Sequence, residues 1–337
     1  MIKDYSPGIL LSVIVAIISI YISNLIPGNV IGAAVFALLF GMIINPFISR
    51  DKRYDQGLSF ITRRVLKLAI ILLGATLSFT QVLEVGKYSL FVMSFTLVAA
   101  FGGGYYLGKL FGMNWKLSSL ISAGTGICGA SAIGAIAPTI EAEPKDIAYS
   151  ISATFIFDIV MIVLFPIAGK YFGMSDLGFG LWTGTAVNDT SSVVAAGYAF
   201  SDVAGSFAII VKLTRTLSVV PIVLIFSYIN EKVKLKDNKD NSVKREKISI
   251  KNIFPWFIIL FLLAVGIKSL GLISDNLSNN ISDISKFFMV MALGSIGLKT
   301  NFREVSKSGY LPMLHGFLIS LLVVIVSFGA QNLMGQI

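Results

Sequence analysis

Two stretches of small and hydroxyl-bearing residues, GTGICGASAIGAIA at 124–137 and GTAVNDTSSVVAAG at 184–197, interrupt otherwise apolar segments of this 337-residue chain. Glycine tolerates broken or strained backbone, so both stretches predict points where a membrane helix unwinds. Broken helices expose N–H groups and half-helix dipoles, which bind an anion without a fixed cation. Tight packing of small residues between helices is the alternative explanation of the same composition.

The residues around these stretches are too apolar for a water-soluble protein. Hydrophobic residues make up 55% of the chain and charged residues 13%, and the mean hydropathy is +0.83. A soluble domain has about 25% charged residues. The composition excludes a disordered, collagen-like or nucleic-acid-binding chain, and it indicates one polytopic domain, 1–337, in a lipid bilayer. Because Cys128 and His315 are the single cysteine and histidine, we expect no disulfide, no metal site and no catalytic triad.

Apolar segments of membrane-spanning length recur along the chain and predict an all-α bundle of about eleven transmembrane helices. No A-x-A-like cleavage site follows the first, which we interpret as a retained helix rather than a signal peptide. The expected spans are 8–26, 30–48, 62–80, 87–110, 116–138, 146–168, 178–200, 203–229, 253–270, 282–300 and 309–333.

The placement of Lys and Arg predicts the orientation of this bundle. The loop at 49–67 and the polar segment at 229–251 are rich in both residues, and each follows an even-numbered span. Loops after odd-numbered spans carry acids such as Glu141, Glu143 and Asp202 with few cations. The positive-inside rule then places the N-terminus and the 229–251 loop in the cytoplasm and the C-terminus outside. The net charge of +9 reflects this bias rather than a nucleic-acid partner.

An internal repeat links LGATLSFTQVLEVGK at 73–87 with LGSIGLKTNFREVSK at 293–307. At an offset of 220, the identical pairs are Leu73/Leu293, Gly74/Gly294, Thr80/Thr300, Glu84/Glu304, Val85/Val305 and Lys87/Lys307. The spans that contain the copies run in opposite directions, which is typical of the inverted repeats of secondary transporters. The stretches at 124–137 and 184–197 do not fit such a pair, because the fifth and seventh spans run the same way. Either one element there is re-entrant or the likeness is compositional.

Four ionisable residues fall inside the expected spans: Asp158, Asp189, Lys212 and Arg215. A charge near the bilayer centre costs several kcal/mol, so it rarely persists without a role. Lys212 and Arg215 are three residues apart and share one face of a helix, where we expect them to attract a small oxyanion. Asp189 is then a site for a coupling Na⁺ or H⁺, and no other cofactor is expected. A structural network of buried ion pairs is the alternative.

The candidate site therefore has two parts. We assign substrate binding to Thr125, Gly126, Gly129, Ser131, Lys212 and Arg215, and ion coupling to Asp158, Asn188, Asp189, Thr190 and Ser191. On this interpretation, replacing Lys212 or Arg215 by alanine abolishes transport while the fold persists.

Across essentially its whole length, the chain resembles the YeiH-like family of sulfate exporters, bacterial inner-membrane proteins grouped with the bile acid/arsenite/riboflavin transporter superfamily. The stretches that carry the resemblance are LKLAIILLGATLSF (66–79), GICGASAIGAIAP (126–138), AVNDTSSVVAAG (186–197), IVKLTRTLSVVPIVL (210–224), FPWF (254–257) and MALGSIGLKTNF (291–302). The resemblance implies a panel-and-core transporter for sulfate or a sulfur-containing organic anion. This sequence departs from the family's pattern at Asn188 and Ser192, where relatives typically have His and Gln.

The sequence thus favours a secondary transporter that moves a small anion by alternating access. A sodium- or proton-coupled importer of organic acids is the first rival, and a non-transporting membrane sensor is the second. An intramembrane enzyme using Ser131 or Ser191 with Lys212 is a remote third, so we expect no enzymatic activity. The expected partners are the lipid bilayer, a small anionic substrate and a second copy of the chain in a homodimer.

Overall fold

The computed structural model describes residues 2–25, 33–49, 51–237, 256–299 and 309–336, and these parts of the chain are helical throughout, without a strand. Their helices are α1 (Ile2–Leu25), α2 (Ala33–Ile48), α3 (Asp55–Phe60), α4 (Leu66–Gly74), α5 (Phe79–Leu110), α6 (Trp115–Ala123), α7 (Ala130–Ile136), α8 (Pro144–Tyr171), α9 (Asp176–Ala186), α10 (Thr190–Phe200), α11 (Asp202–Leu217), α12 (Val219–Asp237), α14 (Phe257–Ser269), α15 (Asp275–Lys299) and α17 (Tyr310–Leu333). The predicted all-α class is therefore confirmed.

Several helices have the length and composition of membrane spans. In the described ranges, six such segments are Tyr5–Leu25, Phe79–Leu110, Lys145–Tyr171, Asp202–Val233, Asp275–Lys299 and Tyr310–Leu333. Shorter apolar helices cover Phe36–Ile48 and Phe257–Ser269. Large apolar side chains such as Phe91, Phe95 and Val98 are exposed along α5, as expected of a surface in contact with lipid.

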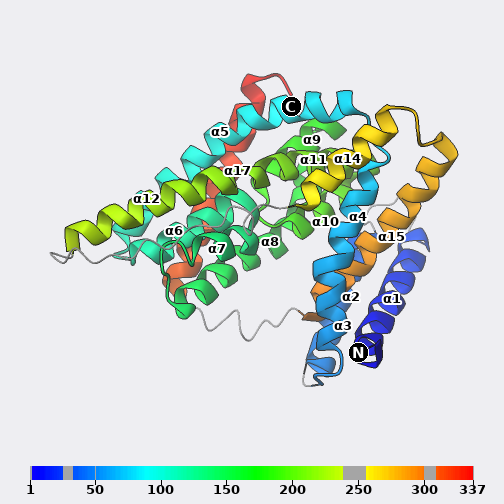
Figure 1. The fold of residues 1–337 in the computed structure, drawn as a ribbon, viewed down its shortest axis with the longest axis horizontal. Helices are drawn as coiled ribbons and strands as arrows, with labels where there is room; N and C mark the ends of the chain where they lie inside the picture. Colours follow the sequence, from blue (N-terminus) through cyan, green and yellow to red (C-terminus); the bar gives the residue numbers. More distant parts are fainter. Residues whose placement is uncertain (1, 26–32, 50, 238–255, 300–308, 337) are drawn as a thin grey trace.

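The helices form two groups, which Figure 1 shows side by side. The panel consists of α1, α2, α3–α4, α14 and α15, which pack on one another. The core consists of α5, α6–α7, α8, α9–α10, α11–α12 and α17. The two groups are in contact where α10 packs against α2 and α15, and an ion pair joins Lys286 of α15 to Asp202 of α11 at 2.6 Å.

The prediction that 116–138 and 178–200 each cross the membrane as one helix is wrong. Both segments fold back as helical hairpins, so their two ends lie together. In hairpin 1 (α6–α7), Lys116 Nζ donates to the Glu141 carbonyl at 2.9 Å. In hairpin 2 (α9–α10), Ser201 Oγ donates to the Asp176 carboxylate.

Local backbone features explain the two turns. In hairpin 1, α6 passes into a π-helical turn, Gly124–Cys128, which ends at Gly129 with φ +63° and ψ −137°. A residue with a Cβ rarely adopts this conformation, so glycine permits the reversal. In hairpin 2, α9 ends at Val187 in an extended conformation, and Asp189 caps the start of α10. The predicted helix breaks therefore occur, but the chain reverses at them instead of continuing.

The two hairpins enter the core from opposite ends of α17. Near the start of α17, His315 Nε2 lies 3.1 Å from Ser118 Oγ of hairpin 1. In its second half, the carbonyl of Val324 accepts from Trp182 Nε1 of hairpin 2 at 3.3 Å. This arrangement resolves the conflict of direction found in the sequence. The two stretches run the same way in a count of spans, yet they belong to re-entrant elements that face each other.

The panel contains contacts that repeat at the sequence offset of 220. A Cβ built on Gly41 of α2 would lie 2.4 Å from the Gly294 carbonyl of α15, and one on Gly74 of α4 would lie 2.5 Å from the Phe261 carbonyl of α14. Residues 41 and 261, and 74 and 294, are each 220 apart. Each residue of the α2–α15 contact is thus equivalent to a residue of the α14–α4 contact. A pair of repeats related by a two-fold axis requires this correspondence. Residues 300–307 of the second copy lie outside the described residues.

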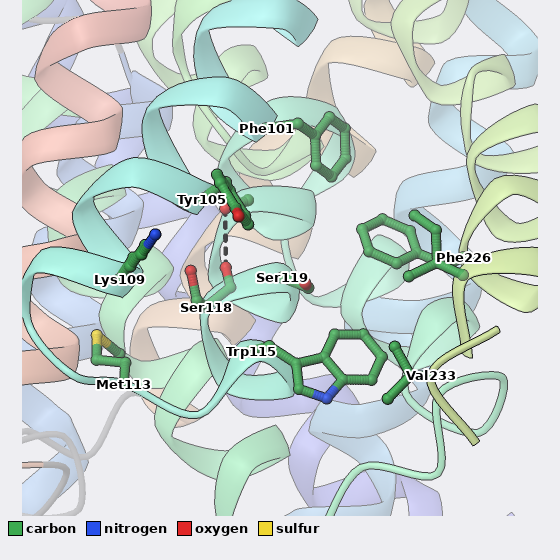
Figure 2. A pocket seen from close by; sticks show the side chains of 12 residues that line it. Phe101, Tyr105, Lys109, Met113, Trp115, Ser118, Ser119, Phe226 and Val233 are labelled. Carbon is green, nitrogen blue, oxygen red and sulfur yellow. Dashed lines mark hydrogen bonds between the residues drawn. The ribbon is translucent and has the colours of Figure 1, made fainter. Parts of the chain in front are cut away.

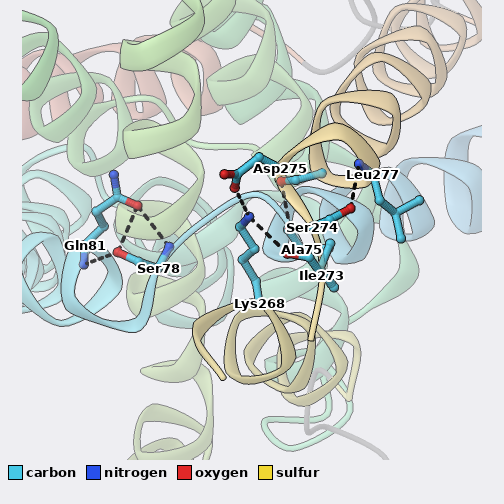
Figure 3. A network of polar contacts seen from close by, with 9 residues as sticks. Ala75, Ser78, Gln81, Lys268, Ile273, Ser274, Asp275 and Leu277 are labelled. Carbon is cyan, nitrogen blue, oxygen red and sulfur yellow. Dashed lines mark hydrogen bonds and ion pairs between the residues drawn. The ribbon is translucent and has the colours of Figure 1, made fainter. Parts of the chain in front are cut away.

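A pair of hydrogen bonds follows the same rule. Ser295 Oγ donates to the Leu58 carbonyl at 2.9 Å, and Ser278 Oγ donates to the Ala75 carbonyl at 3.1 Å. The two residue pairs map onto each other when 220 is added to one partner and subtracted from the other, with the donor of one bond equivalent to the acceptor of the other. Figure 3 shows the end of the panel that contains Ala75, where Lys268 of α14 pairs with Asp275 of α15 at 2.7 Å and Ser78 caps α5 together with Gln81.

Several predicted boundaries change, and α5 begins at Phe79 instead of residue 87. The span expected at 203–229 is kept as the apolar segment Asp202–Val233, but it is interrupted where α11 ends at Leu217 and α12 begins at Val219, shortly before Pro221, which lacks the N–H that a continuous helix needs. The polar loop expected at 229–251 begins later, since α12 continues to Asp237. Residues 238–251 of that loop lie outside the described residues.

Candidate functional site

The tips of the two hairpins meet inside the core. A Cβ built on Gly129 would lie 3.0 Å from Asp189 Oδ1 and 3.1 Å from Asp189 Cβ. Gly129 and Asp189 are 60 residues apart, which is also the offset between the two Gly–Thr stretches. The reversal points of the two hairpins are therefore equivalent positions in contact with each other. The tertiary structure brings the two predicted broken segments together here.

Both basic residues of α11 bind backbone carbonyls at the tips. The Lys212 ammonium donates to the carbonyls of Ile127 and Val187, at 2.8 and 3.0 Å. The Arg215 side chain donates from Nε to Gly126 O at 2.7 Å, from Nη1 to Val187 O at 3.3 Å and from Nη2 to Thr125 O. Lys212 and Arg215 are 0% exposed. They supply the donors that carbonyls at a helix C-terminus lack, and their charge suits the negative end of the helix dipole.

The two acids bind N–H groups in the complementary way. Asp158 of α8, 1% exposed, accepts from Asn188 N at 2.9 Å and Asp189 N at 3.0 Å, just before α10 begins. Asp189 accepts from the backbone N–H of Ser191 at 2.9 Å and from its hydroxyl. In the described part of the chain, no direct ion pair joins these four charges. The alternative explanation, a network of buried ion pairs, is therefore not what the structure contains here, because the four charges bind backbone groups at helix ends instead.

Exposure divides the predicted site residues. Ser131 is exposed, and Asp189 and Thr190 are half-buried. The others are buried: Thr125, Gly126, Gly129, Asp158, Asn188, Ser191, Lys212 and Arg215. A solute entering from outside the core therefore meets Ser131, Thr190 and the Asp189 carboxylate before it meets either cation.

The two hairpins differ in what covers them. On hairpin 2, Val194 is fully buried and α10 packs against the panel helices α2 and α15. On hairpin 1, α7 packs against α6, α8 and α12, while Ala130, Ser131 and Gly134 are exposed. Gly134 is the residue equivalent to Val194 at the offset of 60, and a Cβ built on it would lie within 4 Å of no described atom outside its own helix backbone. One hairpin is therefore closed against the panel, and the equivalent face of the other is open.

Two buried polar atoms at the tips lack a partner in the described part of the chain. They are Thr125 Oγ1 and Asn188 Oδ1. Asn188 Nδ2 lies 3.4 Å from Ser320 Oγ on α17, a residue absent from the predicted site. Ser320 belongs to a small and polar stripe on α17 with Gly316, Ser327 and Gln331, at helical spacing. That periodicity is the signal by which the sequence could have placed α17 against the tips.

Metal-binding clusters are not found within the described ranges, where no group of three or more His, Cys, Asp or Glu residues is placed to hold an ion. The single histidine lies away from the tips, with its Nε2 3.1 Å from both Ser118 Oγ and the Gly104 carbonyl.

Comparisons with known proteins identify the family. The family model described as Conserved hypothetical protein 698 matches residues 7–316. A UPF0324 membrane protein of Clostridium tetani is 65% identical over 342 residues, covering 100% of this chain and 99% of its own. Those of Streptococcus pneumoniae serotype 4 and Streptococcus agalactiae serotype V are 39% and 38% identical, covering 97% and 99% of this chain and 97% and 98% of their own. The chain is therefore a membrane protein that belongs to the UPF0324, or Conserved hypothetical protein 698, family.

Proposed function

We propose that this protein is a secondary transporter that moves a small anion across the membrane by alternating access. The observation that carries the proposal is the unequal environment of two equivalent hairpins. Hairpin 2 is closed against α2 and α15, while the equivalent face of hairpin 1 is open. In a pair of inverted repeats, exchanging the two environments generates a second conformation that is open toward the other side.

The charges at the tips suggest how substrate and coupling ion act together. Asp158, Asp189, Lys212 and Arg215 sum to zero when all four are ionised. Of these, Asp189 is the accessible one, being half-buried. A proton or Na⁺ bound at its carboxylate leaves a net positive tip in a low-dielectric region, which favours an anion there. The anion and the cation then bind together, and the direction of transport follows the larger gradient.

This coupling scheme revises the predicted roles. Lys212 and Arg215 attract the anion through their field rather than by direct contact, because both are fully buried and most of their N–H donors already bind carbonyls. Sulfate or a sulfur-containing organic anion, and export as the direction, rest on the resemblance to the YeiH-like family alone. The accessible carboxylate of Asp189 favours the rival, a cation-coupled importer of organic acids, as the second candidate.

Enzymatic function is not proposed. A Ser–Lys dyad needs the lysine amine within hydrogen-bond reach of the serine hydroxyl, whereas the partners of Lys212 Nζ in the described part of the chain are the carbonyls of Ile127 and Val187. A non-transporting sensor accounts less well for a half-buried carboxylate at the meeting point of two re-entrant hairpins. The predicted homodimer stays a prediction, which the mass of the detergent-solubilised particle checks.

The proposal is tested by counterflow in proteoliposomes loaded with unlabelled sulfate, thiosulfate, a sulfonate or a carboxylate. We expect labelled substrate to accumulate under an imposed proton or sodium gradient, and Asp189→Asn to lower the rate at least about tenfold by removing the ion site. Asp283→Asn, an exposed carboxylate on α15, is the matched control and keeps the rate. Uptake no greater than in protein-free liposomes for all four anion classes would refute transport of a small anion.

A further inference from the structure

A groove separate from the hairpin tips runs between α5, α6 and α12. It has a volume of about 510 Å³, within the range of small-molecule sites, and its lining includes Phe101, Tyr105, Lys109, Trp115, Phe226 and Val233. Figure 2 shows these side chains around the groove, with the Trp115 indole facing Val233. We propose that this groove binds an anionic phospholipid, with an acyl chain along the aromatic residues and the phosphate at Lys109.

The inside of the groove suits a hydrocarbon chain. Phe101 and Phe226 approach each other from α5 and α12, with 5.6 Å between their ring centroids. Two of the three serine hydroxyls on the α6 side, those of Ser118 and Ser122, already have acceptors. Ser118 Oγ donates to the Gly104 carbonyl at 2.8 Å, and Ser122 Oγ donates to the Ser118 carbonyl at 2.8 Å. Because these donors are used, a polar solute would find few hydrogen bonds there, whereas an acyl chain loses none.

The mouth of the groove suits a phosphate group. Lys109 lies in the last turn of α5 and is exposed, and its ammonium makes no hydrogen bond or ion pair with any residue that the structure describes. Tyr105 and Tyr106 are exposed one turn earlier, and Trp115 follows at the start of α6. Tyrosine and tryptophan are enriched at the level of the lipid headgroups. This places the Lys109 ammonium where a headgroup phosphate lies.

Charge complementarity selects an anionic rather than a zwitterionic lipid. The groove reaches Ile229 and Val233 of α12, in the part of that helix where lysine recurs at 232, 234 and 236. Lys232 is exposed there, with its ammonium 4.7 Å from the Tyr228 ring centroid. The sequence predicts that this end of the core faces the cytoplasm. Basic pockets between helices on the cytoplasmic side of a membrane attract acidic headgroups, each lysine contributing roughly 1 kcal/mol.

Tryptophan fluorescence provides the test, because Trp115 lies in the groove. The variant Trp182→Phe/Trp256→Phe retains Trp115 as its only tryptophan. It is reconstituted in vesicles that contain phosphatidylglycerol or phosphatidylcholine with brominated acyl chains, which quench the indole on contact. We expect brominated phosphatidylglycerol to quench at least about twofold more effectively at equal mole fraction, and Lys109→Gln to abolish that preference.

Lys170→Gln is the matched control, since Lys170 lies in the last turn of α8, is exposed, and adjoins Tyr171 and Phe172 without lining this groove. It should leave the preference unchanged. Equal quenching by the two lipids, quenching by neither, or a preference that survives Lys109→Gln would overturn the proposal. Should the double tryptophan variant not fold, the ratio of the two lipids that co-purify with wild type and Lys109→Gln protein decides the same question.

Discussion

At the scale of single residues, the buried charges serve the backbone of the hairpins. Lys212 and Arg215 hold carbonyls from both tips, and Asp158 holds two N–H groups at the start of α10. The residue type and the helical spacing identified these positions correctly as exceptional. Their partners were not predictable, because backbone atoms leave no mark in a sequence. The expectation that alanine at Lys212 or Arg215 preserves the fold therefore needs revision.

We expect Arg215→Met to destabilise the protein by about 3 kcal/mol, since it leaves buried carbonyls and Asp158 uncompensated. Unfolding is followed by a thiol-reactive dye that labels Cys128, the single cysteine, which is buried at the tip of hairpin 1. Thr214→Ala is the control, because Thr214 Oγ1 bonds only to the Ile210 carbonyl of its own helix. An Arg215→Met variant as stable as wild type would contradict the structural role.

At the scale of elements, the hairpins replace two predicted spans. The stretches of small and hydroxyl-bearing residues correctly predicted where the helices break. The same composition occurs in a broken helix that continues across the membrane and in a hairpin that turns back, so it does not distinguish the two. What distinguishes them is the contact between distant residues, such as Lys116 with Glu141. The conformation at Gly129 decides hairpin 1, because the chain reverses there against Asp189.

Gly129→Ala is therefore expected to cost about 1–3 kcal/mol, from backbone strain and from the close approach to Asp189. Gly134→Ala, in the same hairpin, meets no atom within 4 Å and is expected to be neutral or to stabilise α7 by roughly 0.5–1 kcal/mol. Comparing the thermal unfolding midpoints of the two variants checks this difference. Equal midpoints would mean that the reversal at Gly129 does not require glycine.

At the scale of the whole molecule, the hairpins change the predicted topology. Each re-entrant hairpin removes one of the predicted crossings, and the removal of two leaves the prediction that the N- and C-termini lie on opposite sides of the membrane unchanged. The loop after α7 moves to the side of the loop after α5, and the loop after α8 moves to the other side. Lys145 and Lys170 therefore change sides in opposite directions, and the number of basic residues on each side stays the same. The positive-inside bias is the same for both arrangements and does not distinguish them.

Cysteines introduced into a Cys128→Ala background distinguish the two topologies. We expect an impermeant maleimide to label Lys109→Cys and Glu143→Cys from one side, and Lys170→Cys and Val203→Cys from the other. All four positions are exposed. The arrangement with straight spans instead pairs position 109 with 170 and position 143 with 203. Labelling in that second pattern would show that the hairpins span the membrane.

The sequence by itself determined the membrane location, the all-helical class, the repeat at an offset of 220 and the residues at the centre of the core. It did so because hydropathy, periodicity and isolated charges are properties of the chain read in order. Only the tertiary structure decided that the two Gly–Thr segments reverse, that Gly129 meets Asp189, and that the buried charges bind helix ends. Those outcomes depend on backbone groups and on segments far apart in the chain, whose partners become defined only when the helices pack.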